Sequence, residues 1–318
     1  MPNMDIVVLS SYIDCNKLYG TVNNLLECVD ADRIVVIGCS QIYGELKGLW
    51  AHNVVFMDEN DILPIGDVKE YYRTLVPSGG NSPNWYYQQF LKFSYAEYSN
   101  ADYYLTWDSD TALVKKHTFF DAVSGKPYFD MKTEFHKPYF TTIRNLFSDV
   151  DKIATGSFIS EHMVFHKVRV LEMQNEIMQN TAIDGENYWQ KIFNAADINE
   201  LKTTAAFSEF ETYGSWMQVR HPEEYLEREW KSLRNGVCYY STMEKALKDC
   251  EFLSKEFDAI SIEYGHSDKK YIMTPLSVLF WNPVFKSMWM PTKLFDFLHD
   301  RGLAYWTGEK EEYKRRKN

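Results

Sequence analysis

Short apolar segments alternate with helical patterns in the N-terminal third of the chain, and this alternation is the strongest constraint on the fold. Four segments are predicted as buried strands, at residues 5–10, 33–38, 53–57 and 103–107. Apolar residues at helical spacing lie between them, within residues 16–29, 67–75 and 85–98. Buried strands that are joined through helices form parallel sheets with right-handed crossovers. The pattern therefore predicts an α/β fold, with a mixed, mainly parallel sheet flanked by helices.

The second half has weaker signals. A strand is predicted at residues 162–166, helices at 168–179, 186–196 and 208–219, and late strands at 237–240 and 259–264. Residues 265–318 contain 10 Lys/Arg and 6 Asp/Glu, so they carry +4, whereas residues 1–264 carry −15. We expect one domain over residues 1–264 and a helical, aromatic and basic C-terminal extension over 265–318. This extension would pack on the domain or contact a membrane surface.

Charge and cysteine content exclude several classes. The 318 residues carry a net charge of −11, and no Lys/Arg run precedes the last residues, so nucleic acid is not an expected partner. Five cysteines without a CxxC pair argue against a disulfide framework or a zinc site. A basic leader and an apolar stretch of about 20 residues are both absent from the sequence, which favours a cytoplasmic protein.

Two acidic residues follow the fourth predicted strand directly. Asp108 and Asp110 flank Ser109, and hard divalent cations such as Mn²⁺ or Mg²⁺ take oxygen ligands of this kind. A cation held there neutralises the diphosphate of a sugar nucleotide as it leaves. Ser10, Ser11 and Tyr12 follow the first predicted strand. Ligands of parallel sheets bind at the carboxyl ends of strands, so both segments are expected to line one crevice.

Three segments resemble bacterial glycosyltransferases of the GT-A type, above all those encoded with capsule and lipopolysaccharide synthesis. They are WYYQQFLK at 85–92, YYLTWDSDT at 103–111 and SEFETYG at 208–214, and the resemblance extends over roughly residues 5–220. It implies a GT-A fold and a transferase that moves a sugar from a nucleotide-sugar donor to a glycan or lipid-linked glycan acceptor in surface polysaccharide synthesis. The 16% aromatic content suits carbohydrate handling, although a Tyr/Phe-rich core explains it equally well.

The resemblance also implies site residues. Asp108 and Asp110 would hold the metal, with Asp110 the more direct ligand. The nucleotide-sugar contacts would come from Ser10, Ser11, Tyr12, Gln89, Lys92, Asp108 and Ser109. Gln89 and Lys92 are equally compatible with an exposed helix face, and Trp85 with the core. His221 and His266 are candidates for a third metal ligand.

The acceptor hydroxyl needs a base if the transfer inverts the sugar configuration. Glu209 and Glu211 stand at a predicted helix start, and we expect one of them to act as the base of an inverting hexosyltransferase. Ser208 and Glu211 also have the spacing of a capping box, which would occupy Glu211 and favour Glu209. Asp184 and Glu186 are the second choice for the base. A retaining reaction, which has no obligatory base, is the alternative to an inverting one.

Two other functions compete with this interpretation. The DxDxT string also fits a haloacid-dehalogenase-like phosphatase with Asp108 as nucleophile, although its downstream acidic motif is missing from the sequence. A non-catalytic sugar-binding protein on the same scaffold is the second alternative. Separately, Trp281, Trp289 and the basic residues 314–317 suggest peripheral contact with the inner face of the membrane. A C-terminal segment that closes the core is the competing explanation.

Overall fold

The computed structural model describes residues 2–50, 53–77, 82–133, 135–203, 205–234, 236, 239–240 and 242–262. These residues form two compact units. Unit 1 contains the described residues of Met1–Cys15, Ala31–Asp108 and Phe119–Arg228. Unit 2 contains those of Asn16–Asp30, Ser109–Thr118 and the described residues from Glu229 onward.

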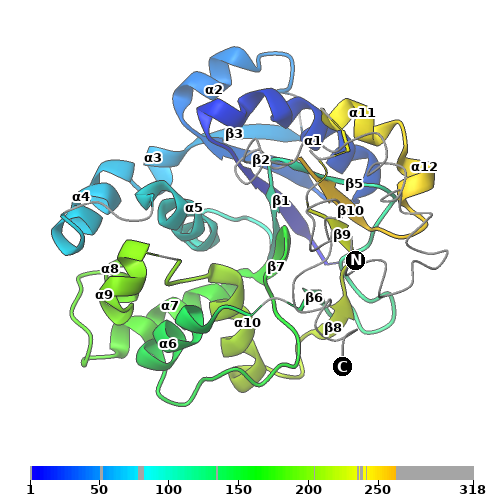
Figure 1. The fold of residues 1–318 in the computed structure, drawn as a ribbon. Helices are drawn as coiled ribbons and strands as arrows, with labels where there is room; N and C mark the ends of the chain where they lie inside the picture. Colours follow the sequence, from blue (N-terminus) through cyan, green and yellow to red (C-terminus); the bar gives the residue numbers. More distant parts are fainter. Residues whose placement is uncertain are drawn as a thin grey trace, which may run out of the picture. The chain divides into compact units, whose positions relative to one another are not determined.

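A five-stranded sheet forms the centre of unit 1 (Figure 1). Its strands follow the order β3-β2-β1-β4-β7. Its strands are β1 (Met4–Leu9), β2 (Arg33–Gly38), β3 (Val54–Asp58), β4 (Tyr103–Asp108) and β7 (His162–His166). The first four are parallel, whereas β7 pairs antiparallel with β4. Every residue of β1 is buried, as expected for a sheet that is covered on both faces.

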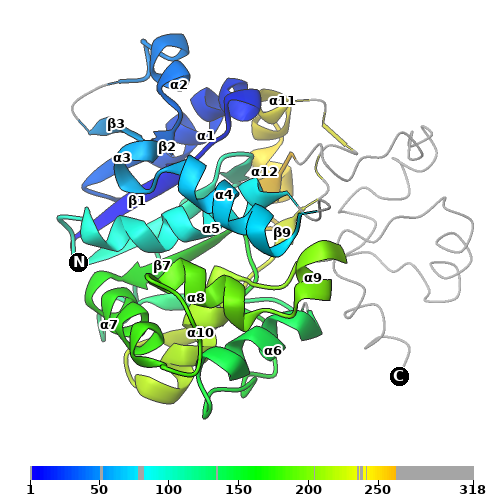
Figure 2. The ribbon, with the colours of Figure 1, turned by 90° about the vertical axis from the view of Figure 1, so that its left-hand side faces the viewer.

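Helices of unit 1 cover the sheet face that carries Val7, Leu9 and Tyr104. Among them, α6, α7, α8 and α10 pack against one another (Figure 2). The helices of this unit are α2 (Ser40–Glu45), α3 (Glu59–Ile62), α4 (Ile65–Leu75), α5 (Pro83–Ser94), α6 (Lys137–Leu146), α7 (Lys167–Gln179), α8 (Tyr188–Ala195), α9 (Ile198–Thr203) and α10 (Glu209–Arg220), with 3₁₀ turns η1 (Tyr12–Asp14) and η2 (Tyr95–Glu97). A two-stranded sheet joins β6 (Tyr128–Met131) to β8 (Leu226–Glu229).

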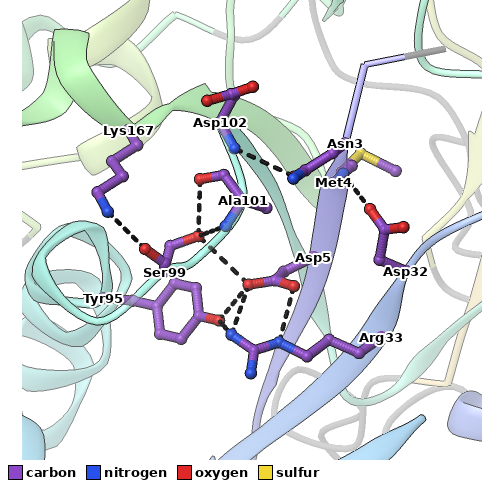
Figure 3. A network of polar contacts seen from close by, with 10 residues as sticks. All are labelled: Asn3, Met4, Asp5, Asp32, Arg33, Tyr95, Ser99, Ala101, Asp102 and Lys167. Atoms are coloured by element: carbon purple, nitrogen blue, oxygen red, sulfur yellow. Dashed lines mark hydrogen bonds and ion pairs between the residues drawn. The ribbon is translucent and has the colours of Figure 1, made fainter.

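A buried polar network joins the strands at the amino end of the sheet (Figure 3). Asp5 and Arg33 are paired across β1 and β2, and the guanidinium donates to the carboxylate at 2.8 and 2.9 Å. The Tyr95 and Ser99 hydroxyls donate to the same carboxylate at 2.6 and 3.2 Å. Because a strand rises about 3.3 Å per residue, this network lies about 16 Å from the carboxyl end at Ser10. The network therefore stabilises the sheet at the end opposite to the predicted site.

Unit 2 has its own small sheet and its own core. Its strands are ordered β5-β10-β9, with bounds Thr111–Leu113, Ala259–Ser261 and Ser232–Leu233. Its helices are α1 (Cys15–Cys28), which belongs to this unit from Asn16 onward, α11 (Met243–Leu247) and α12 (Cys250–Leu253). Leu253 and Ile260 lie at the centre of the core, both fully buried.

The predicted α/β class with a mainly parallel sheet is confirmed. The predicted strand at 237–240 is wrong for Tyr239 and Tyr240, whose N–H groups both donate to the carbonyl of Gly236 and so form a turn. The predicted extension at 265–318 lies outside the described residues. In the described part of the chain, no helix combines the length and apolar character that crossing a bilayer requires.

Candidate functional site

The carboxyl ends of two neighbouring strands lie side by side in unit 1. β1 and β4 are parallel, and Leu9 is the register partner of Asp108. Ser10, which follows Leu9, is therefore next to the last residue of β4. The sheet order makes the first and fourth predicted strands direct neighbours, and the crevice expected at their carboxyl ends stays a prediction.

The three residues after β1 differ in exposure. Ser10 is 5% exposed, and its hydroxyl donates to the Ser11 carbonyl. The Ser11 hydroxyl is exposed and donates to Asp14 at 2.9 Å. Tyr12 is 49% exposed, and the nearby carboxylate of Glu45 raises the pKa of its phenol. The side chains of Ser11 and Tyr12 are therefore accessible to a ligand, whereas that of Ser10 is buried.

A buried lysine connects Asp108 with Glu209. The Lys92 ammonium lies 3.2 Å from Asp108 Oδ1 and 2.7 Å from Glu209 Oε1, although Glu209 is 117 residues away in the chain. The ammonium also lies 4.3 Å from the centroid of the Phe210 ring. Burial lowers the pKa of Lys92, but Asp108 and Glu209 outweigh it and keep this pKa above its ordinary value.

Helix α5 places Lys92 because it packs against the sheet face that carries Leu9 and Asp108. Side chains alternate between the faces of a strand, and register partners share a face, so the Asp108 carboxylate points toward α5. Gln89 lies one turn before Lys92, and the oxygen Oε1 of its side-chain amide accepts the Glu209 N–H at 3.0 Å. The sequence left Gln89 and Lys92 open between donor contact and exposed surface; the structure buries both of them at the centre of this cluster.

The start of α10 supplies the two candidate bases. The Ser208 side chain accepts the Glu211 N–H at 3.3 Å, which is the N-cap that the spacing predicts. The Glu211 carboxylate is fully buried and accepts hydrogen bonds from the Ser157 hydroxyl and the Phe158 N–H. Glu211 therefore holds residues 157–158, whereas Glu209 is linked to Asp108 through the ammonium of Lys92.

The residues after Asp108 belong to unit 2. The Ser109 carbonyl accepts a hydrogen bond from the Thr21 hydroxyl at 2.7 Å. The Asp110 carboxylate lies 3.9 Å from the Lys17 ammonium. The backbone carbonyl of Asp110 accepts a hydrogen bond from the Ile262 N–H. Thr21 and Lys17 both come from α1, which thereby positions the segment after β4.

Asp108 and Asp110 have the ligand chemistry for a divalent cation. Their side chains are 36% and 25% exposed, and Mg²⁺ is commonly bound by one or two carboxylates together with water and phosphate oxygens. No group of three or more His, Cys, Asp or Glu side chains close enough to hold a metal ion occurs within the described residues. Each of the two carboxylates thus offers oxygen atoms of the kind that such a cation takes as ligands.

Sequence reasoning missed a second buried ion pair beside the end of β4. The Asp108 N–H donates to the carbonyl of Glu161, and the Glu161 carboxylate lies 2.7 Å from the Lys132 ammonium. The Lys132 side chain is 7% exposed and that of Glu161 is 1% exposed. Lys132 directly follows β6 and Glu161 directly precedes β7. A charged residue at the end of each apolar strand was therefore the sequence feature that could have indicated this pair.

Other predicted residues lie away from this cluster. His221 directly follows α10, and its ring lies 3.2 Å from Glu172 and 3.5 Å from Glu224. Twelve residues of helix separate it from Glu209, or about 18 Å at 1.5 Å per residue, which argues against His221 as a third ligand beside Asp108. Asp184 and Glu186 are exposed before α8. His266, Trp281, Trp289 and residues 314–317 lie outside the described residues.

Comparison with known proteins gives one family and several distant structures. A model described as "Family of unknown function (DUF6492)" matches residues 15–240, whereas the search of curated proteins finds no match. Apo mouse xyloside xylosyltransferase 1 is 12% identical, with a TM-score of 0.45 and coverage of 84% of this chain and 98% of that one. Galactosyltransferase LgtC, in complex with donor and acceptor sugar analogs, is 11% identical, with a TM-score of 0.43 and coverage of 91% and 98%. Glycosyltransferase GlyE of Streptococcus pneumoniae TIGR4 is 9% identical, with a TM-score of 0.39 and coverage of 98% and 66%.

Proposed function

The chain belongs to the family of unknown function DUF6492, and from its site we propose that it is a metal-dependent glycosyltransferase of the GT-A type. It would move a sugar from a nucleotide-sugar donor to a glycan or lipid-linked glycan acceptor. One observation carries this proposal: β1 and β4 end side by side, and Lys92 links Asp108, at the end of β4, to Glu209. The residues that would contact the nucleoside, the carboxylate that would bind a metal and the proposed base therefore lie close to one edge of the same sheet.

Each residue has a proposed role. Ser11 and Tyr12 would contact the nucleoside, with Ser10 fixing the start of their loop. Asp108 and Asp110 would hold Mn²⁺ or Mg²⁺, which when bound would supply the positive charge that neutralises the leaving diphosphate. Lys92 would orient Asp108 and Glu209, and Gln89 would hold the first residue of α10.

The proposed reaction is an inverting hexosyl transfer. The acceptor hydroxyl oxygen attacks the anomeric carbon, and the bond from that carbon to the β-phosphate oxygen breaks. The nucleoside diphosphate leaves with the electron pair of the broken bond, and the hydroxyl proton passes to the Glu209 carboxylate. We further propose a role in synthesis of capsule or lipopolysaccharide at the cytoplasmic face of the membrane, which the resemblance in the WYYQQFLK, DSD and SEFETYG segments supports.

The first step is to identify the nucleotide-sugar donor. Thermal denaturation in the presence of UDP-, GDP- and dTDP-sugars, with and without Mn²⁺, selects it. A ligand at a hundredfold excess over its Kd adds about 2.7 kcal/mol of stability. The selected donor then serves in a turnover assay that follows Mn²⁺-dependent release of the nucleotide.

Asp110→Ala tests the proposal. We expect this variant to lose Mn²⁺-dependent turnover while its melting temperature stays close to that of the wild type, because the Asp110 side chain is partly exposed. Asp30→Ala is the matched control, since Asp30 is an exposed aspartate of the same unit. Full activity of Asp110→Ala would reject the metal assignment. Phosphate release from p-nitrophenyl phosphate that is lost in Asp108→Asn would instead indicate the phosphatase, and sugar binding without turnover would indicate the binding protein.

A further inference from the structure

We propose that an aromatic patch at the beginning of α5 binds the acceptor glycan by stacking on its sugar rings. The patch consists of Trp85, Phe135, His136 and Tyr139, all of them in unit 1. The identity of its occupant rests on the proposed glycosyltransferase function, whereas the existence of a sugar-binding patch can be tested separately.

The rings of the patch are ordered against one another. Trp85 and Tyr139 are near-parallel, with an interplanar angle of 17° and centroids 6.5 Å apart. His136 packs on Tyr139 with centroids 4.5 Å apart. Phe135 stacks on the buried ring of Phe140 at 5.4 Å and 9°. These contacts hold the rings in place before any ligand arrives, which lowers the entropic cost of binding.

Two of these rings are open to solvent although they are large and apolar. Trp85 is 36% exposed and Phe135 is 56% exposed, while Tyr139 and Phe140 beneath them are buried. Exposed polar residues adjoin them in the chain, namely Ser82, Asn84 and Lys137. A sugar presents an apolar C–H face and a rim of hydroxyl groups, so flat aromatic surfaces beside polar side chains match its chemistry.

The patch begins on the same face of α5 that carries two residues of the proposed catalytic cluster. Trp85, Gln89 and Lys92 are spaced at i, i+4 and i+7, so their side chains lie on the same side of the helix. Seven residues at 1.5 Å each separate Trp85 from Lys92 by about 10 Å along the axis, which a short oligosaccharide spans. His136 binds the Ala205 carbonyl at 2.7 Å, in the segment that leads directly to Glu209. An acceptor with its end at Glu209 would therefore place its next sugar units on the patch.

The test uses an array of defined mono-, di- and trisaccharides probed with the full-length labelled protein. Trp85→Ala removes the stacking surface, Trp85→Phe keeps a flat ring, and Tyr98→Ala removes an aromatic side chain of similar exposure, 38%, beyond the other end of α5. We expect Trp85→Ala to weaken binding of the best disaccharide about tenfold, the scale of one lost stacking contact. Trp85→Phe should retain most of the affinity, and Tyr98→Ala should equal the wild type.

Two further measurements separate the possible outcomes. Melting temperatures confirm that each variant is folded, and the thermal shift given by the nucleotide-sugar donor reports the donor site alone. Wild-type affinity for the array in Trp85→Ala, or no glycan binding by the wild type, would overturn the patch. Failure of every nucleotide sugar to bind, together with Trp85-dependent glycan binding, would overturn the proposed transferase and leave the patch standing.

Discussion

At the scale of single residues, the site depends on a lysine that is buried among carboxylates. Lys92 retains its charge because Asp108 and Glu209 compensate for the water it has lost. Removal of one partner from such an ion pair lowers the free energy of unfolding by more than the intact pair contributes to it, because the other charge remains buried without a partner. The sequence places Lys92 on a helix next to the DSD segment, but nothing local to Lys92 indicates Glu209 as its partner.

The buried carboxylate of Asp130 gives a pH-dependent prediction. Asp130 is 4% exposed and accepts hydrogen bonds from Arg228 at 2.6 and 2.7 Å, and it lies 2.8 Å from the His162 ring. Burial raises the pKa of Asp130, but Arg228 and His162 outweigh it, so its folded-state pKa lies below the ordinary value of 3.8. The unfolded chain then binds the proton more readily, and stability rises with pH through this window.

We therefore expect Asp130→Asn to lower the free energy of unfolding by about 3 kcal/mol at pH 7 and by less at pH 3. The stabilisation by Asp130 is complete above the unfolded pKa and disappears as the pH falls through the folded pKa. Urea denaturation at pH 3, 4, 5 and 7 measures the difference. A loss that is the same at all four values would show that charge on Asp130 is not the cause.

At the scale of elements, the start of α10 is determined by the cap on its first turn, and its position is determined by close packing around its middle. Ser208 caps the helix as the capping-box spacing predicts. Every residue from Glu209 to Met217 is buried, so this helix has no solvent-facing stripe over that length. Periodicity could therefore indicate that a helix forms here, but not which surface of it contacts the sheet.

Gly214 supplies the element-scale prediction. A Cβ at this position would overlap the ring of Phe158, whereas a Cβ at Gly66 in α4 would meet open space. Alanine normally stabilises a helix relative to glycine by restricting the unfolded chain. We expect Gly66→Ala to raise the free energy of unfolding by about 0.5 kcal/mol and Gly214→Ala to lower it by about 2 kcal/mol. Thermal denaturation of both variants checks this, and equal shifts of the same sign would contradict the close approach of α10 to Phe158.

At the scale of the whole molecule, charge is the property that the chain distributes unevenly. Residues 265–318 carry +4, against −15 for the rest, and five of their basic residues lie within residues 309–318. A basic segment gains about 1 kcal/mol per charge near an anionic membrane surface. This segment lies outside the described residues, so its charge alone supports the prediction.

Deletion of residues 309–318 should weaken co-sedimentation with vesicles that contain phosphatidylserine and leave the small residual binding to phosphatidylcholine vesicles unchanged. Raising the salt concentration should have the same effect on the full chain, since screening shortens the reach of surface charge. Equal sedimentation of the full and shortened chains on anionic vesicles would rule out an electrostatic membrane contact through this segment.

The four parallel strands up to Asp108, the helices α1, α4 and α5 and the cap at Ser208 follow from the sequence, because apolar periodicity and capping chemistry act between residues that are close in the chain. The short helices α2 and α3 were not predicted, and β4 extends one residue beyond its predicted end. The tertiary structure alone decided that β7 pairs antiparallel with β4, that Lys92 joins Asp108 to Glu209, and that Lys132 and Glu161 form a buried pair beside them. Such partners come from distant segments, and a local pattern records that a side chain will be buried without specifying which group will meet it there.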